Sequence, residues 1–273
     1  MWNGIDEELC QVDRYFYSET FVTQNVIEKF QHRIKNLVRV GPLRNFSPFI
    51  SLKSNVKKRV LINFGGGDSY LSDFCLVVEF YALLISIIFE CFSNQIIEMC
   101  ICGGNHIIHS LREYRLPKTD FDMKYCSLGE KEYMEYLYNS EYIILSPGLG
   151  NFFESISTDK KLMMIPPINY SQFLQLEKFK NLSIGIYGMN WSDFYFYNPI
   201  KEYLKEEDGV NQVLNHINLF MEHTYSQQQF KVLVQEFING NNKEFLQNRQ
   251  EFYNSISKNG VNKVAGIIKE DLC

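Results

Sequence analysis

Residues 141–154 read Glu-Tyr-Ile-Ile-Leu-Ser-Pro-Gly-Leu-Gly-Asn-Phe-Phe-Glu, and the fold that we expect is built outward from this stretch. Residues 142–145 form a short apolar run of the kind that a buried strand uses. Pro147, Gly148 and Gly150 then predict a tight, open turn whose backbone a ligand can approach closely. The segment that follows is expected to be a helix, whose first N–H groups and positive dipole end suit a phosphate.

Three polar residues of this stretch support a nucleotide site. Ser146 and Asn151 are donors near the expected helix start, and Glu154 lies one turn in, where a carboxylate suits a ribose hydroxyl. We interpret the stretch as the phosphate and ribose end of a nucleotide site. The alternative is that Asn151 only caps the helix and that Glu154 completes a capping box, because Asn151-x-x-Glu154 has that spacing.

The rest of the chain alternates between strands and helices around this stretch. Strands are expected at residues 58–64, 95–102, 121–126, 142–145, 161–165 and 182–187. Helices are expected at residues 71–93, 105–114, 130–139, from the opening turn to about residue 158, and at 171–180. Repeated strand–helix units predict an α/β, Rossmann-like parallel sheet with helices on both faces, whose ligands bind at the carboxyl ends of the strands.

The chain is expected to have three parts. Residues 1–56 are expected to be a remnant of an N-terminal domain with a linker, and residues 57–190 the Rossmann-like domain. Residues 191–273 are expected to form a helical C-terminal tail that packs on that domain. The helices of the tail are expected at residues 209–220, 226–238, 243–252 and 261–272.

Two further glycine clusters follow expected strands. The first comprises Gly65, Gly66 and Gly67 with Ser69, and it suits a diphosphate or a sugar. Its alternative is a tight turn in which Asp68 or Ser69 caps the next helix.

The second glycine cluster comprises Gly103 and Gly104 with Asn105. Its backbone could bond the edge of a base while Asn105 caps a helix, and the alternative is a plain turn. His106 and His109 follow without a carboxylate pattern, so we expect no metal site there.

A last polar group follows the expected strand at residues 161–165. Asn169, Gln172 and Gln175 are uncharged hydrogen-bonding residues that suit sugar hydroxyls. The alternative is a proline-stopped turn with Ser171 as the helix cap. The sequence shows no catalytic triad and no acid–base pair of carboxylates, so the catalytic residues stay unknown.

Composition narrows the class of protein. The 273 residues carry a net charge of −5 without a long basic tract, which argues against nucleic acid as a partner. Seven irregularly spaced cysteines fit reduced thiols in a cytoplasmic protein better than a zinc site. The apolar run at residues 76–92 contains Glu79 and Glu90 and is shorter than the roughly 20 residues of a membrane span, so we expect a buried helix there and no transmembrane span.

Two motifs taken together carry a family resemblance. Ser-Pro-Gly-Leu-Gly-Asn-Phe-Phe-Glu, followed by Lys-Leu-Met-Met-Ile-Pro-Pro and Asn-Tyr-Ser-Gln, resembles the donor-binding half of GT-B glycosyltransferases. The similar group comprises the peptidoglycan N-acetylglucosaminyl transferase, the macrolide-type transferases and cytosylglucuronate synthase. Gly65-Gly66-Gly67 resembles the glycine loop after the first strand of their C-terminal domain. The resemblance covers about residues 36–190.

The resemblance implies a nucleotide-diphosphate sugar donor of UDP type, bound without a metal or another cofactor. It implies that Gly148, Leu149 and Gly150 meet phosphate, Glu154 the ribose and Gln172 the donor sugar. A complete GT-B enzyme also has an N-terminal acceptor domain, whereas only about 45 residues precede the donor-type part here. The resemblance therefore implies a donor-binding part whose N-terminal domain either has been lost or lies on a partner subunit or second chain that supplies the acceptor domain.

Two other functions remain open. The chain could be a non-catalytic or degenerate nucleotide-binding subunit of a split transferase. It could also be a nucleotide-sugar hydrolase or epimerase, for which His106 is the nearby candidate base.

Overall fold

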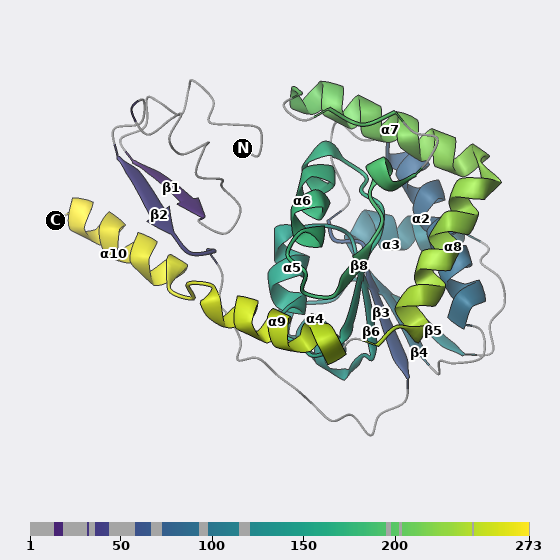
Figure 1. Cartoon of the computed structure of the whole chain (residues 1–273), viewed down its shortest axis with the longest axis horizontal. Coiled ribbons are helices and arrows are strands. Elements are labelled where there is room, and N and C mark those ends of the chain that lie inside the picture. Colours follow the sequence, from purple (N-terminus) through teal and green to yellow (C-terminus); the bar gives the residue numbers. More distant parts are fainter. Residues whose placement is uncertain are drawn as a thin grey trace.

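The structure is a computed structural model that describes residues 14–18, 32, 36–43, 58–66, 73–92, 98–114, 121–194, 198–201, 204–241 and 243–272. Its main body is a six-stranded sheet with helices on both faces (Figure 1). The strands of this sheet are β3 (Arg59–Asn63), β4 (Glu98–Cys102), β5 (Asp122–Cys126), β6 (Tyr142–Leu145), β7 (Lys161–Met164) and β8 (Ile186–Gly188).

The helices that connect these strands agree closely with the expected ones. They are α2 (Phe74–Phe92), α3 (Asn105–Glu113), α4 (Glu130–Asn139), α5 (Leu149–Ser155) and α6 (Tyr170–Lys180). After β8 come a 3₁₀ turn, η2 (Trp191–Asp193), and the helices α7 (Glu206–Glu222), α8 (Thr224–Asn239), α9 (Lys243–Ser255) and α10 (Gly260–Leu272). The predicted α/β class, with a parallel sheet and a helical C-terminal segment, is confirmed.

Every pair of neighbouring strands in the sheet is parallel, and the order is β5-β4-β3-β6-β7-β8. The first strand of this sheet, β3, thus lies in its middle. The chain then adds β4 and β5 on one side of β3 and returns to add β6 on the other side. Such a reversal is the topological switch point of a doubly wound sheet, where the carboxyl ends of the two central strands leave a crevice. Here the switch point lies between β3 and β6.

The strands are buried because their side chains feed two separate cores. Alternate residues of a strand point to opposite faces. In β3, Val60 and Ile62 join the core on one face, whereas Leu61 joins the core on the other. This two-sided burial explains why the strands read as continuous apolar runs without polar alternation.

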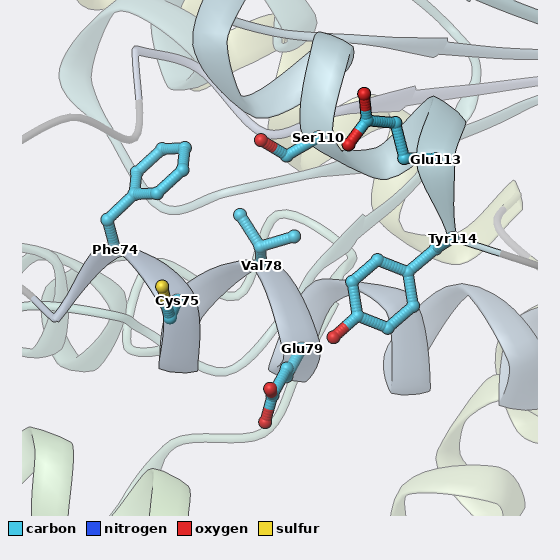
Figure 2. Close-up of a pocket in the computed structure, with 7 residues that line it drawn as sticks. All are labelled: Phe74, Cys75, Val78, Glu79, Ser110, Glu113 and Tyr114. Atoms are coloured by element: carbon cyan, nitrogen blue, oxygen red, sulfur yellow. The ribbon is translucent and has the colours of Figure 1, made fainter.

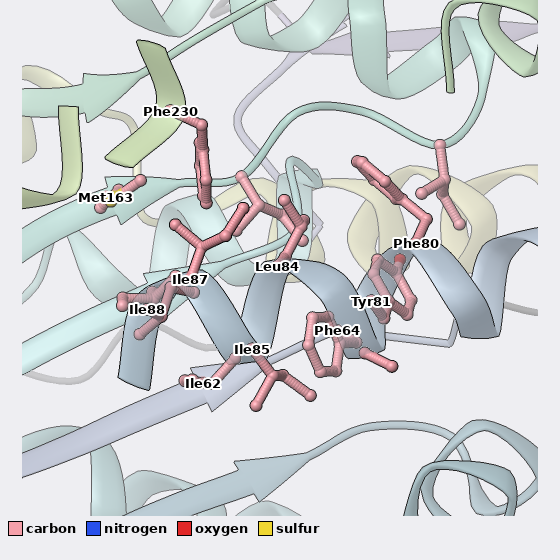
Figure 3. Close-up of a cluster of buried hydrophobic side chains, with 14 of the residues drawn as sticks. Ile62, Phe64, Phe80, Tyr81, Leu84, Ile85, Ile87, Ile88, Met163 and Phe230 are labelled. Carbon is pink, nitrogen blue, oxygen red and sulfur yellow. The ribbon is translucent and has the colours of Figure 1, made fainter. Parts of the chain in front are cut away.

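Helix α2 forms the centre of the larger core (Figure 3). It contacts α3, α7 and α8, and the Tyr81 ring stacks on Phe64 with the ring centroids 4.0 Å apart. Among the described helices, α2 alone is long and apolar enough to cross a membrane by length and composition. Eleven of its 19 residues are buried, so the structure confirms the buried helix that was expected.

Helices α4, α5, α6 and α9 supply the core on the opposite face. Phe152 of α5 stacks on Phe179 of α6 with ring centroids 4.1 Å apart and planes 10° apart. Tyr253 of α9 is buried in the same cluster. Since α9 comes from the C-terminal tail, this part of the tail packs against the core of the main sheet.

The last strand begins later than the sequence indicated. We expected residues 182–187, but β8 comprises Ile186–Gly188. The reason is a bend, because Ser183 and Gly185 have φ values of 53° and 71°, in the left-handed region that a strand does not use. A side chain at Gly185 would also lie 2.4 Å from Cβ of Phe245.

The N-terminal part that the structure describes is a separate two-stranded parallel sheet of β1 (Tyr15–Ser18) and β2 (Leu37–Val40). Helix α10 lies along it, away from the main sheet (Figure 1). Lys263 Nζ donates to the carbonyl oxygen of Arg39 at 2.9 Å, and Arg14 pairs with Asp271 at 2.6 Å. The end of the tail therefore packs on β2, which corrects the expectation that all of it covers the Rossmann-like domain.

Candidate functional site

Three of the predicted site loops meet at one edge of the sheet. The loops after β4 and β6 flank the loop after β3, because β3 pairs with both of these strands. The Gly104 N–H donates to the carbonyl oxygen of Gly65 at 2.8 Å, and the Ser146 N–H donates to that of Asn63, also at 2.8 Å. The glycine clusters are thus brought together at the switch point. Gly67 and Ser69 lie outside the described residues.

Side-chain hydrogen bonds join the loops of β3 and β6. Asn63, the last residue of β3, accepts from the Gly65 N–H at 2.8 Å. Its Nδ2 donates to Oδ1 of Asn151 at 3.1 Å, and Asn151 Nδ2 donates to the carbonyl oxygen of Ser146 at 3.0 Å. The sequence reasoning missed Asn63. The available signal was a lone polar residue near the end of an apolar strand, two residues before three glycines.

The glycines after β4 have a packing reason. A Cβ at Gly104 would lie 2.5 Å from the carbonyl oxygen of Gly66, and one at Gly103 would lie 3.2 Å from that of Gly65. These two glycines let the loop approach the β3 loop. Gly104 is the N-cap of α3, and Asn105 is its first residue, so the expectation that Asn105 caps this helix is wrong. Contacts of Asn105 with a base stay a prediction.

The glycines at the switch point itself differ in this respect. Gly65 has a φ of 65°, a conformation that favours glycine. Among the residues that the structure describes, a Cβ at Gly66 would meet no atom within 4 Å, and one at Gly148 would meet only the Ser146 carbonyl oxygen at 4.0 Å. Gly148 is extended, with a φ of −176° that any residue adopts. Packing against the described residues does not explain why positions 66 and 148 are glycine. At Gly148 the backbone conformation does not explain it either.

Helix α5 begins inside the opening turn and ends sooner than expected. Its N-cap is Gly148, which provides no side-chain cap, and Asn151 is a residue of its first turn. The alternative that Asn151 caps the helix and Glu154 closes a capping box is therefore wrong. The helix ends at Ser155 instead of about residue 158. Just beyond this end, the Ser157 hydroxyl donates to the carbonyl oxygen of Glu154, and the Thr158 hydroxyl donates to that of Ser155.

The backbone of this turn has N–H groups before the first intrahelical bond. That bond runs from the Phe152 N–H to the Gly148 carbonyl oxygen at 2.8 Å, so the N–H groups of Leu149, Gly150 and Asn151 precede it. Glu154 is half-buried and follows Gly150 by four residues, on the same side of the helix. Backbone donors and one carboxylate are thus placed together.

Ser146, which was predicted to donate a hydrogen bond to the ligand, is buried beneath the turn after β6. Its side chain is 2% exposed, and its Oγ lies 3.5 Å from the Tyr81 hydroxyl. Burial raises the pKa of the Tyr81 phenol, which the hydrogen bond to Ser146 partly opposes. The arrangement makes Ser146 a support of the β6 loop, since water and ligands do not reach a hydroxyl this deep.

At the start of α6, two predicted sugar ligands bond each other. Asn169 is the N-cap and accepts from the Gln172 N–H at 2.9 Å, while Gln172 Oε1 accepts from the Ile168 N–H at 3.0 Å. Ser171 instead donates to Glu206 at 3.2 Å, so the alternative of a Ser171 cap is wrong. Gln175, one turn further, is buried, and its Oε1 has no hydrogen-bond partner among the residues that the structure describes.

Two histidines lie on helix α3, which begins directly after the glycines of the β4 loop. His106 is exposed on α3, and His109 lies 3.6 Å from Glu113. Within the described ranges, no three His, Cys, Asp or Glu residues gather as metal ligands would. A pocket of about 380 Å³ between α2 and α3 is lined by residues such as Phe74, Glu79 and Tyr114, and none of the predicted site residues lines it (Figure 2).

Comparisons with known proteins give a fold-level likeness only. No family model and no curated protein sequence matches this chain. Among solved structures, the glycotransferase of kitacinnamycin is 12% identical with a TM-score of 0.43, and the match covers 88% of this chain and 50% of that one. Arabidopsis thaliana UGT89C1 complexed with quercetin is 12% identical with a TM-score of 0.44, and the match covers 91% and 58%.

CalG4, the calicheamicin glycosyltransferase, is 10% identical with a TM-score of 0.36, and the match covers 84% of this chain and 49% of that one. This chain thus spans about half the length of the glycosyltransferases that it matches. At such TM-scores the matches carry no argument about activity. The fold defines a protein of the α/β, Rossmann-like class, with three glycine-bearing loops gathered at the carboxyl edge of its sheet.

Proposed function

We propose that the carboxyl edge of the main sheet binds a nucleotide-diphosphate sugar of UDP type, and that the chain is the donor-binding part of a glycosyltransferase. The observation that carries this proposal is the open space at Gly66 and Gly148, on the two sides of the switch point. Among the described residues, an added Cβ at Gly66 would meet nothing within 4 Å and one at Gly148 would meet the Ser146 carbonyl oxygen at 4.0 Å, whereas Gly103 and Gly104 next to them are tightly packed.

The chemistry of the edge favours an anion bound through the backbone. The side chains of Ser146, Asn151 and Asn169 already have partners within the protein, whereas the turn at residues 148–151 has backbone N–H groups at its surface end. Backbone donors at the start of a helix suit phosphate oxygens and need no metal. We assign the diphosphate to this turn and to Gly65–Gly66.

The two ends of the ligand follow from this placement. Glu154, one turn beyond Gly150, is assigned to the ribose hydroxyls, which a carboxylate can accept from. Gln172 uses its Oε1 for Ile168, so we assign its amide nitrogen to the donor sugar. The loop of Gly103, Gly104 and Asn105 is assigned to the base.

The acceptor and the catalytic base are assigned to a second surface that faces this edge. The exposed His106 gives no support to a hydrolase or epimerase, because no carboxylate is seen to orient it among the described residues. A transferase therefore needs another domain or a partner chain opposite the switch point.

The test uses two substitutions of Gly148 that differ in charge alone. Asp and Asn both cap helices well, so Gly148→Asp and Gly148→Asn should fold like the parent. Titration calorimetry with UDP, CDP and UDP-sugars should show that Gly148→Asp lowers nucleotide affinity at least about tenfold more than Gly148→Asn, because two like charges would meet. Gly266→Ala in α10, where an added Cβ meets nothing within 4 Å, is the control.

The outcomes separate the candidate functions. If the parent protein binds none of these nucleotides, or if Gly148→Asp binds them as the parent does, the donor-site proposal is wrong. Tighter binding of CDP than of UDP would change the base. Binding of a UDP-sugar with neither transfer nor hydrolysis would favour the non-catalytic subunit.

A further inference from the structure

We propose that Asn63 is a positioning residue of this site, which holds the β3 loop and the first turn of α5 in one arrangement before a ligand binds. The inference rests on the proposed function, and it adds a residue that neither the glycine motifs nor the family resemblance contains. Asn63 touches no proposed ligand atom. It acts through Gly65 on one side and Asn151 on the other.

The hydrogen bonds through Asn63 can run in one direction only. The Gly65 N–H is a donor, so it must face Oδ1 of Asn63, which turns Nδ2 toward Asn151. Asn151 must then present its Oδ1, and its own Nδ2 meets the Ser146 carbonyl oxygen, which can only accept. Because a donor begins the series and an acceptor ends it, a flip of either amide would break two bonds.

Because Asn63 is buried, losing the hydrogen bonds that run from Gly65 through Asn63 and Asn151 to Ser146 costs free energy. Asn63 is 9% exposed, at the end of a strand whose other inward residues are apolar. A buried amide costs free energy unless its polar atoms are paired. An aliphatic residue would continue the strand, but it would leave the Gly65 N–H and the Asn151 amide without these partners. The structure thus has a polar residue where strand packing alone calls for none.

The position of these hydrogen bonds points to their role. They cross the switch point from Gly65, whose left-handed φ shapes the loop after β3, to Asn151 in the first turn of α5. Gly66 and Gly148, with their open space, lie on its two sides. Fixing both loops in advance lowers the ordering cost of binding, because less conformational entropy is lost when the ligand arrives.

Two variants distinguish the hydrogen bond from Gly65 to Asn63 from the hydrogen bond between Asn63 and Asn151. Asn63→Asp keeps an acceptor for the Gly65 N–H but removes the donor to Asn151, whereas Asn63→Ala removes both. In the ligand-free protein, we expect amide exchange of residues 152–155, whose N–H groups follow the first intrahelical bond of α5, to rise at least tenfold in both variants. Exchange at Gly65 should rise in Asn63→Ala alone. UDP affinity should fall tenfold or more in both, at a temperature where each variant is fully folded.

The control is Ile143→Val, a mild core substitution in β6 that lowers stability without touching the series. It should leave UDP affinity and the exchange of residues 152–155 unchanged. If the Asn63 variants raise exchange throughout β3 and β6, or if UDP affinity is retained, Asn63 is merely structural and the inference is wrong. Absence of nucleotide binding by the parent protein would instead defeat the proposed function, and the exchange data would still decide whether Asn63 links the loops.

Discussion

Arg249 of α9 donates through Nε to the carbonyl oxygen of Ile184 at 3.0 Å, joining the C-terminal tail to the bend before β8. The same guanidinium donates to the carbonyl oxygens of Thr158, Lys160 and Gly185. The side chain is fully buried, and burial lowers the pKa of the guanidinium, while the charge of Asp159 raises it. Arg249 thus ties together two loops at the opposite edge of the sheet from the candidate site.

Replacing Arg249 should destabilise the protein without changing the site. Arg249→Met keeps much of the volume but leaves four carbonyl oxygens without this donor, at an expected loss of about 2–4 kcal/mol in the free energy of unfolding. Urea unfolding measures the loss. Arg249→Lys should lie between, because an ammonium cannot reach the same acceptors as the planar fork. A loss below about 1 kcal/mol for the Met variant would contradict this role.

The second prediction concerns two helical glycines. A Cβ at Gly209 of α7 would lie 2.2 Å from the buried Tyr170 ring, whereas one at Gly266 of α10 would meet nothing within 4 Å. Gly209→Ala should therefore destabilise by roughly 1–3 kcal/mol through overpacking. Gly266→Ala should stabilise by about 0.5–1 kcal/mol, since alanine favours a helix. Thermal unfolding of the two variants checks both signs, and equal effects would show that α7 does not pack this closely.

The third prediction is a pH dependence of stability. Glu98 of β4 pairs with Arg59 of β3 at 2.7 Å and with Lys124 of β5 at 2.8 Å. Burial tends to raise the pKa of Glu98, but the bonds and charges of Lys124 and Arg59 outweigh it, so the pKa is lowered.

A lowered pKa means that the ion pairs stabilise the fold above the pKa of the unfolded state. That stability is lost as the pH falls through the lower pKa of the folded state. At pH 7, Glu98→Gln should cost about 1–2 kcal/mol, because both cationic partners remain partly exposed and can be solvated. Urea unfolding of parent and variant should show the difference shrinking toward zero in acid, and a constant difference would argue against the ion pairs.

The fourth prediction concerns thiol reactivity. Cys75 is exposed at the start of α2, whereas Cys100 is buried with its Sγ 3.4 Å from that of Cys126. The pKa of the Cys100 thiol is raised mainly by its hydrogen bond with Cys102 and, to a smaller extent, by burial. Burial raises the pKa of the Cys126 thiol to about 12. Alkylation of the native protein, followed by peptide mass spectrometry, should modify Cys75 roughly ten times faster or more than Cys100. Equal rates in native protein and equal acceleration by urea would contradict the buried placement.

Much of the fold could be predicted from local patterns. The helix at residues 130–139 and the strand at residues 142–145 agree with the structure residue for residue. Strands of this domain are buried on both faces, so each reads as an apolar run without needing knowledge of its neighbours. The expectation for residues 182–187 was wrong because a left-handed bend and a buried arginine 65 residues away delay β8.

The candidate site could be predicted only in part. Glycines after parallel strands identify the edge, because carboxyl ends of such strands face the same way. They do not distinguish Gly104, which another loop packs against, from Gly148, which has open space. They also do not show that Asn151 bonds Asn63, because that bond depends on which strands are neighbours.

The sequence by itself determined the class of fold and the edge where its loops gather, because periodicity and turn residues act over a few positions. Only the tertiary structure decided that β6 lies beside β3, and hence that the turn at residues 148–151 faces Gly65 and Gly66 across a switch point. Strand order follows from long-range packing of the two cores, and no local pattern in the chain encodes that packing.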